Sequence, residues 1–257
     1  MNRLTYAALC LLCLVNPILA ADCPTDRIDE TVSVKYVYDG DTLKLSEGRK
    51  IRILGIDAPE LEHDRQAGEP LAEQSRDYLR QLIAPSGKLA LRHDREQHDR
   101  YGRQLSHVFL SDGRNISAEL LRKGLATTLI LPPNFWAADC YKKVESIARK
   151  NSKGVWQLPD FQPQALADLP KLKKSKYLVV SGTVQSTKTR SERIQIVLAN
   201  GKNTLILAID SDVQPLFVPF LKKISPGHLV TVKGWVNPHD GALIMHLRHN
   251  SAILDLS

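Results

Sequence analysis

Short segments in which apolar and polar residues alternate, separated by turns that contain glycine, are prominent in this chain. Residues 32–38, 42–45 and 50–56 are three such segments, and the turns between them contain Gly40 and Gly48. Alternation with a period of two is typical of half-buried strands, and Gly at the connections favours tight turns. A three-stranded meander is therefore predicted near the start of the chain.

Helical spacing follows in the rest of the first half. Apolar residues recur three and four positions apart in 69–83, 115–123 and 134–151. This spacing predicts three helices that each bury one face. Two further strands are expected at 88–92 and 105–110. The first half is therefore predicted to combine a five-stranded sheet with three helices.

The second half consists of further short strands and one helix. Three strands, a helix and two strands, in this order, are typical of a small OB-type barrel. We therefore predict an α+β, mainly β fold, in which the five strands and three helices of the first half are followed by a small OB-like barrel. Phe217, Phe220 and Trp235 are expected in the second core. The strands are expected at 178–183, 194–198, 204–208, 229–236 and 242–247, and the helix at 213–223.

Positive charge is concentrated in the C-terminal third. The chain has a formal charge of +7, but residues 22–164 hold 22 basic and 22 acidic side chains, whereas residues 165–257 hold 12 basic and 6 acidic ones. This asymmetry favours two domains and an anionic polymer or surface as partner of the second. A basic surface that only maintains solubility is the alternative.

Proline and lysine mark the boundary between the two halves. Residues 157–176 contain three prolines and the run Lys171-Leu172-Lys173-Lys174-Ser175-Lys176. Proline disfavours regular structure, and basic residues stay solvated, so this composition favours a linker. We predict a first domain at 22–160, a linker at 161–176 and a basic OB-like domain at 177–257.

The first 21 residues are organised like a secretory signal peptide. Arg3 precedes an apolar run over residues 6–14, and Ala20 and Ala21 offer small side chains for cleavage. The run is short for a membrane span, although an uncleaved anchor is the alternative. We expect an exported protein, periplasmic or secreted, without stable membrane insertion after the signal is removed.

Removal of the signal would leave two cysteines, Cys23 and Cys140. An even number of cysteines in an oxidising compartment favours a disulfide. A bridge over so long a loop would contribute about 4 kcal/mol in the chain-entropy model. Two free thiols are the alternative, because pairing requires Cα atoms within about 7 Å.

Charged side chains gather where the strands of the meander meet their turns. Asp41 follows the first turn, and Asp57, Ala58 and Glu60 follow the strand that carries Arg52. Carboxylate and carbonyl oxygens are the ligands that Ca²⁺ prefers, and guanidinium groups match phosphate oxygens. The set suits metal-assisted phosphodiester hydrolysis. Asp-Gly turns and charged strand ends are also common in proteins without this chemistry.

The order of the motifs is more specific than the residue types. Asp39-Gly40-Asp41-Thr42, Arg52 with Asp57-Ala58-Pro59-Glu60, Asp99-Arg100-Tyr101-Gly102-Arg103, Gly124-Leu125-Ala126 and Gly154-Val155-Trp156 follow one another. In this order they resemble the thermonuclease (staphylococcal-nuclease-like) family, over about residues 31–158. The resemblance implies that the first half is an OB-type five-stranded barrel with three helices, which the second small OB-like barrel follows. It also implies a Ca²⁺-dependent nuclease that cleaves the P–O5′ bond of DNA and RNA and leaves a 3′-phosphate.

The resemblance also implies roles for single residues. Asp41 and Asp57 match the carboxylates that bind Ca²⁺, and Ala58 matches the residue that lends its carbonyl oxygen. Glu60 matches the carboxylate that activates or orients the attacking water.

Two arginines, Arg52 and Arg103, match those that contact the scissile phosphate, and Tyr101 is placed to touch a phosphate. The chain departs from the family pattern after the Gly-Leu-Ala motif. Residues 127–133 hold no aromatic side chain, where the family has tyrosines that pack on the nucleotide. Substrate preference and the choice between internal and terminal cleavage stay open.

The resemblance leaves residues 165–257 unexplained. A basic OB-like domain beside a nuclease is suited to hold a nucleic-acid backbone. The candidate contacts are Lys173, Lys174, Lys176, Lys188, Arg190 and Arg193.

Two other functions are compatible with these features. A nucleic-acid-binding protein built from two OB-type barrels would bind in a salt-dependent way without cleaving. A cell-envelope protein would use its basic C-terminal part to bind anionic surface polymers. The filled acidic and arginine positions favour the nuclease over both.

Overall fold

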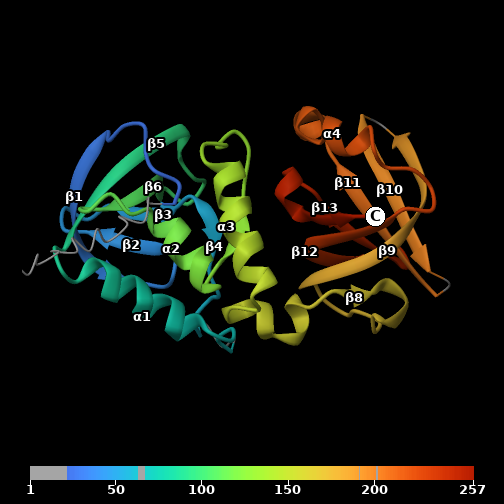
Figure 1. Cartoon of the computed structure of the whole chain (residues 1–257), viewed down its shortest axis with the longest axis horizontal. Helices are drawn as coiled ribbons and strands as arrows, with labels where there is room; N and C mark the ends of the chain where they lie inside the picture. Colours follow the sequence, from blue (N-terminus) through green and yellow to red (C-terminus); the bar gives the residue numbers. More distant parts are fainter. Residues whose placement is uncertain (1–21, 63–66, 191, 201) are drawn as a thin grey trace, which may run out of the picture.

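Two barrels lie side by side in the computed structural model (Figure 1). The structure describes residues 22–62, 67–190, 192–200 and 202–257. The predicted signal peptide, residues 1–21, lies outside the described residues. Among those that are described, no helix is long and apolar enough to cross a membrane.

Five strands close the first barrel in the spatial order β1-β2-β3-β6-β5. β3 and β6 run parallel, and the other neighbours run antiparallel. The alternation predicted from the sequence places Leu43, Leu45, Ile51 and Ile53 in the core, where each is fully buried. The bounds are β1 (Glu30–Val37), β2 (Thr42–Leu45), β3 (Lys50–Ile53), β5 (Lys88–His98) and β6 (Gln104–Leu110).

Three helices pack on this barrel: α1 (Ala72–Ile83), α2 (Ile116–Lys123) and α3 (Ala138–Lys150). The Asn115 side chain caps α2 by accepting a hydrogen bond from the Ala118 N–H at 3.1 Å. Gly124 ends α2 with a φ of 67°, a conformation that favours glycine. Figure 1 shows α3 on the side of the first barrel that faces the second.

A two-stranded ribbon stands beside the first barrel. β4 (Gly55–Asp57) follows β3 directly and pairs with β7 (Thr127–Leu129). Gly55 has a φ of 87°, and a Cβ atom there would lie 2.2 Å from the ring of Tyr141. The sequence indicated one continuous strand to residue 56 and no strand at β7. The ribbon carries Asp57 away from the barrel wall.

The second barrel repeats the strand order of the first. Its strands follow the order β9-β10-β11-β13-β12, and β12 pairs back onto β9. β11 and β13 run parallel, as β3 and β6 do. The predicted fold class, two successive OB-type barrels, is confirmed. The bounds are β9 (Lys176–Arg190), β10 (Arg193–Asn200), β11 (Asn203–Ile209), β12 (Leu229–His239), β13 (Ala242–His246) and the added edge strand β14 (Ile253–Leu256).

Details of the second barrel differ from the prediction. The expected helix is mostly the 3-10 helix η4 (Ser211–Phe217), continued by the short α4 (Val218–Leu221). Pro215 and Pro219 each lack an N–H, so neither supports an α-helical ladder. Phe217 and Phe220 are buried as predicted. The placement of Trp235 in the core was wrong, because its side chain is 49% exposed.

The segment expected to form a linker packs onto the second barrel. After the 3-10 helices η1 (Gly154–Gln157) and η2 (Pro159–Phe161), β8 (Gln164–Ala165) pairs with β9, and η3 (Leu166–Asp168) follows. Leu166 and Leu169 are buried in the second core. The apolar side chains of this segment, rather than its prolines, decide where it lies.

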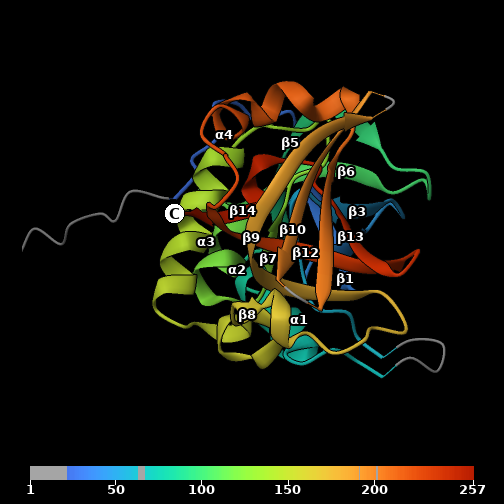
Figure 2. The same ribbon diagram turned by 90° about the vertical axis from the view of Figure 1, so that its right-hand side faces the viewer.

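Buried contacts join the two barrels. The ammonium group of Lys233 on β12 pairs with Glu145 on α3, and each side chain is 2% exposed. Lys233 also donates to the carbonyl of Thr128 on β7 at 3.2 Å. Val179 of β9 packs in an apolar cluster with Trp156 and other residues of the first half. Figure 2 views the molecule from the side of the second barrel, which stands in front of α3.

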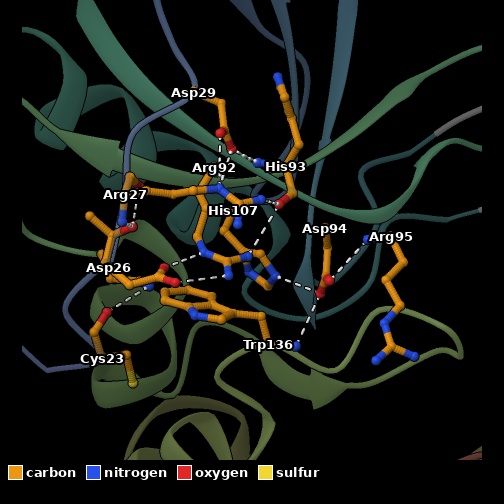
Figure 3. A network of polar contacts seen from close by, with 12 residues as sticks. Cys23, Asp26, Arg27, Asp29, Arg92, His93, Asp94, Arg95, His107 and Trp136 are labelled. Carbon is orange, nitrogen blue, oxygen red and sulfur yellow. Dashed lines mark hydrogen bonds and ion pairs between the residues drawn. The ribbon is translucent and has the colours of Figure 1, made fainter.

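The N-terminal segment is fastened to the first barrel by a disulfide and a polar network. Cys23 and Cys140 are bonded, with Cα atoms 5.6 Å apart, so the predicted pairing is present. Figure 3 shows Asp26 reaching Arg92 of β5, whose guanidinium group lies 4.2 Å from the ring centre of Trp136. The bridge anchors α3 to the start of the described chain.

Candidate active site

An acidic corner lies where β2 begins and β4 ends. Thr42 opposite Arg52 is the first register pair of β2 and β3, which puts the preceding Asp41 beside the end of β3. Asp41 accepts a hydrogen bond from the Ala58 N–H at 2.8 Å. Asp57 is the last residue of β4. The structure therefore brings together Asp41 and Ala58, which are 17 positions apart in the sequence.

Asp39 shapes the turn that presents Asp41. One carboxylate oxygen of Asp39 accepts hydrogen bonds from the N–H groups of Asp41, at 2.9 Å, and Thr42, at 2.7 Å. A carboxylate bonded to the main chain two and three residues later holds a turn in one conformation. Asp39 belongs to the Asp-Gly-Asp motif, but the sequence alone assigns it no role.

Arg52 bridges the two carboxylates of the corner. Its Nη2 atom lies 3.1 Å from Asp41 and 3.0 Å from Asp57. Its Nη1 atom donates to the carbonyl groups of Ile53 and Ile56 at 2.8 and 2.9 Å. Burial opposes the charge of this guanidinium group, but Asp41 and Asp57 outweigh it and raise the pKa of Arg52.

The corner holds more negative charge than Arg52 can balance. Burial, reinforced by the charge of Asp41, raises the pKa of Asp39 to about 6. Burial also raises the pKa of Asp57 to about 6, although Arg52 opposes the shift. Desolvation, followed by the charges of Asp39 and Asp41, raises the pKa of Glu60 to about 7, even though this residue keeps contact with solvent. An added cation would relieve this repulsion.

Glu60 is fixed through its main chain by Glu69. The N–H of Glu60 donates to the carboxylate of Glu69 at 3.0 Å, and the N–H of Glu69 donates to the carbonyl of Glu60 at 2.8 Å. Glu69 thereby holds the segment that carries Glu60 beside the corner. No sequence signal pointed to this role.

The oxygen atoms of the acidic corner are of the kind that bind a hard cation such as Ca²⁺. In the described ranges, no three His, Cys, Asp or Glu side chains converge closely enough to form a metal site by themselves. The carboxylates of Asp41 and Asp57 and the carbonyl of Ala58 are all oxygen donors, and Ca²⁺ commonly completes its shell with main-chain and water oxygens. Burial is the main cause of the raised pKa values of Asp39 and Asp57, and the charge of Asp41 adds to both, so a nearby cation would favour their ionised forms.

Arg103 directly precedes the strand next to Arg52 and lies outside the corner. β6 runs beside β3 with Leu105 opposite Arg52, so Arg103 comes two positions before that pair, in the turn that leads into β6. Its Nε donates to Asp99 at 2.7 Å, and its guanidinium carbon lies 5.6 Å from the ring centre of Tyr101, which is 68% exposed. The Asp99 bond uses Nε, so the Nη atoms of Arg103 are available to a phosphate.

Comparison with known proteins shows the family of the chain. The family model described as Staphylococcal nuclease homologue matches residues 50–158. An "Uncharacterized endonuclease" of Escherichia coli O157:H7 is 30% identical over 167 residues, which cover 62% of this chain and 93% of that protein. The chain belongs to the staphylococcal nuclease homologue family. Membership makes it a nuclease, a hydrolase of phosphodiester bonds.

Two other relatives each match about half of the chain. The "Thermonuclease" of Staphylococcus intermedius is 29% identical over 136 residues, 52% of this chain and 80% of that protein. "Endonuclease YhcR" of Bacillus subtilis (strain 168) is 32% identical over 138 residues, 49% of this chain and 11% of that much longer protein.

The second barrel lies beyond the matched staphylococcal nuclease homologue domain. Of the six predicted nucleic-acid contacts, Lys173, Lys174 and Lys176 line a cavity between the barrels. The other three stay predictions outside that cavity: they are Lys188, Arg190 and Arg193, the last paired with Asp210.

Proposed function

We propose that this nuclease is exported and hydrolyses phosphodiester bonds of DNA, RNA or both with the help of Ca²⁺. The convergence of Asp41, Asp57 and Arg52 beside Glu60 carries the proposal. A bound Ca²⁺ would be held by the carboxylates of Asp41 and Asp57 and the carbonyl of Ala58, and would supply positive charge against a phosphate oxygen.

The protein's own groups perform the remaining steps. Glu60 orients a water molecule toward phosphorus and accepts its proton. Arg52 and Arg103 donate hydrogen bonds to the phosphate oxygens, whose negative charge increases in the five-coordinate transition state. Tyr101 contacts a neighbouring phosphate. Cleavage of the P–O5′ bond would leave a 3′-phosphate and a 5′-hydroxyl, which a polynucleotide kinase can label directly.

Hydrolysis of single-stranded DNA by the mature protein, with Ca²⁺ and with a chelator, tests the proposal. Glu60→Gln should abolish most Ca²⁺-dependent cleavage. Glu47→Gln makes the same change in the turn between β2 and β3 and should leave cleavage unchanged. Cleavage that is insensitive to the chelator and to Glu60→Gln would contradict the mechanism. Binding without any cleavage would instead favour the non-catalytic binding protein.

The two arginines provide a second test. We predict that Arg52→Ala or Arg103→Ala costs about 3 kcal/mol of transition-state stabilisation, or about two orders of magnitude in kcat/KM, while the fold survives. Arg49→Ala, which removes a more exposed arginine from the β2–β3 turn, is the matched control. Near-normal turnover by both site variants would exclude these roles.

Export is proposed from the N-terminal sequence and from the Cys23–Cys140 disulfide. N-terminal sequencing of the protein recovered from the periplasm and from the medium tests it. A mature chain that begins at Ala21 or Asp22 is expected, and an intact Met1 on a cytoplasmic protein would contradict it.

A further inference from the structure

A large cavity opens between the two barrels and reaches the acidic corner. Its volume is about 1030 Å³, at the upper end of the range for sites that enclose small ligands. On the side of the first barrel it is lined by Asp57, Ala58 and Thr127. Residues 171–177 and Trp235 line it from the second barrel. Anything bound in the cavity would therefore extend from the second barrel to the candidate active site.

Trp235 presents an exposed ring to this cavity. It lies on β12 opposite Tyr177 of β9, with the two ring centres 6.0 Å apart. Tyr177 packs in turn against Phe161 at 5.3 Å, and Phe161 packs against the buried Trp156 at 5.9 Å. This series of rings supports Trp235 from one side and leaves 49% of its surface open. A supported, half-exposed indole is suited to stack on a flat apolar group.

Lysines surround the ring. Lys171, Lys173 and Lys174 are exposed on the cavity wall, and no carboxylate within the described part of the chain forms an ion pair with them. Lys176 is paired with Asp160 at 2.8 Å. Free ammonium groups beside an aromatic surface are the combination that binds a phosphate backbone and its bases together.

The wall formed by the first barrel lacks an aromatic surface of its own. Thr127 lines the cavity, and the segment from residue 127 to residue 133 contains no aromatic side chain. The aromatic residues that line the described cavity are Phe161, Tyr177 and Trp235, and Trp235 has the most exposed ring of the three. The basic second barrel therefore contributes the most exposed ring of a cavity that Asp57 also lines.

We propose that the cavity between the barrels binds a single strand of the nucleic-acid substrate next to the cleaved bond, with Trp235 stacking on a base and Lys171, Lys173 and Lys174 contacting phosphates. The proposal rests on the proposed nuclease function. It commits to a single strand because a base must leave its own stack to lie on an indole.

The test compares a polymeric substrate with a small one in the full mature chain. The polymeric substrate is a single-stranded DNA oligonucleotide of about 12 nucleotides, within the range that one OB-type module covers. The small one is bis(4-nitrophenyl) phosphate, a phosphodiester without bases. Trp235→Ala should raise the KM for the oligonucleotide by about 5- to 100-fold, and should leave hydrolysis of the small ester unchanged. Trp235→Phe, which keeps a ring, should restore most of the affinity.

The role of the lysines is tested by measuring how oligonucleotide binding depends on salt concentration, with a chelator present to prevent cleavage. Lys173→Ala/Lys174→Ala should weaken oligonucleotide binding and lower the salt slope by about 0.7 for each phosphate that the variant no longer neutralises. Lys222→Ala/Lys223→Ala removes a matched adjacent pair at the end of α4, outside the cavity lining, and should change neither. If circular dichroism shows that Trp235→Ala does not fold, the binding and salt slope of the Lys173→Ala/Lys174→Ala variant decide whether the proposal holds.

The outcomes separate the two proposals. If the unaltered protein cleaves neither substrate, the proposed function fails. If it cleaves both and the Trp235 and lysine variants retain its oligonucleotide KM and salt slope, the cavity is not the strand-binding site. Quenching of indole fluorescence by the oligonucleotide, lost in Trp235→Phe although binding persists, would identify Trp235 as the stacking residue.

Discussion

Gly40 occupies a position in the acidic corner where a side chain would collide with its neighbours. A Cβ atom there would lie 1.9 Å from the hydroxyl of Ser75 and 2.6 Å from the Cβ of Ala58. Ala58 in turn donates its N–H to Asp41, the residue after Gly40. Crowding at this point therefore displaces the groups that hold the carboxylate of Asp41.

We predict that Gly40→Ala lowers kcat/KM by about tenfold or more and destabilises the fold by about 1–3 kcal/mol. Gly48→Ala is the control, because no atom lies within 4 Å of the Cβ position of Gly48; unlike Gly40, Gly48 has a positive φ, of 106°. The control should lose stability and keep its activity. If both variants hydrolyse the small phosphodiester equally fast, the prediction is wrong, because displacement of the groups around Asp41 would then not affect activity.

Glu69 is expected to act through Glu60. Because its carboxylate accepts the N–H of Glu60, Glu69→Ala should free the segment that carries Glu60 and reduce kcat by about 10- to 100-fold with little change in KM. Glu69→Gln retains an acceptor oxygen and should recover most of the rate. Loss of activity in both variants, or in neither, would contradict a positioning role.

The residues that strand ends bring together in the acidic corner could be predicted from the sequence. Asp41, Arg52 and Asp57 were predicted as a group, and the distances of about 3 Å between them match that grouping. Glu69 could not be found, because its bonds to Glu60 depend on the path of the intervening chain. Trp235 was misplaced because its apolar neighbours suggested a buried strand, whereas its own side chain points out of the core.

At the scale of elements, the β4–β7 ribbon links the acidic corner to the second barrel. β4 ends at Asp57, and β7 offers the carbonyl of Thr128 to Lys233. The N–H of Thr128 donates to Glu145 at 2.5 Å, and Glu145 also pairs with Lys233. One buried ion pair thus connects α3, β7 and β12.

Removal of one partner of this pair should be costly. Lys233→Met leaves the carboxylate of Glu145 buried without a counter-charge, so we predict a loss of about 3–5 kcal/mol in the free energy of unfolding in urea. Adding Glu145→Gln, which removes that charge and keeps an acceptor for Thr128, should recover much of the loss. A double variant no more stable than Lys233→Met would contradict the assigned coupling.

Elements with a strong local pattern could be predicted, and those defined by distant partners could not. The meander, the three helices and the hairpin strands carry their own periodicity and turn residues. β7 has three residues and exists because β4 lies beside it. The α-helix predicted at 213–223 is mostly a 3-10 helix, because its prolines break the α-helical hydrogen-bond ladder.

At the scale of the whole molecule, the two barrels share one strand order but differ in what surrounds it. The order of the second barrel was readable from its sequence of strands and helix. The way it faces the first was not, because the Lys233–Glu145 pair joins residues 88 positions apart. Charge asymmetry indicated two domains, but it did not indicate that a cavity between them would reach Asp57.

A histidine at the contact between the barrels makes this arrangement sensitive to acid. The ring of His249 stacks on Phe135, with centres 5.9 Å apart, and its Nδ1 accepts the N–H of Ser251 at 3.1 Å. Burial, with the charge of Lys142 acting in the same direction and Asp139 opposing, lowers the pKa of His249 to about 4. The folded protein therefore holds this ring neutral, as the Nδ1 acceptor requires.

Stability should consequently fall as the pH is lowered from about 6.5 to about 4. In this window the unfolded chain binds a proton at His249 that the folded protein excludes, so acid favours unfolding, by up to about 3 kcal/mol at the lower end. His249→Asn keeps a side-chain acceptor for Ser251 but cannot titrate there. Thermal unfolding of both proteins across this range should show the difference between them shrinking or reversing toward pH 4. Parallel profiles would mean that His249 gains its proton without disturbing the contact between the barrels.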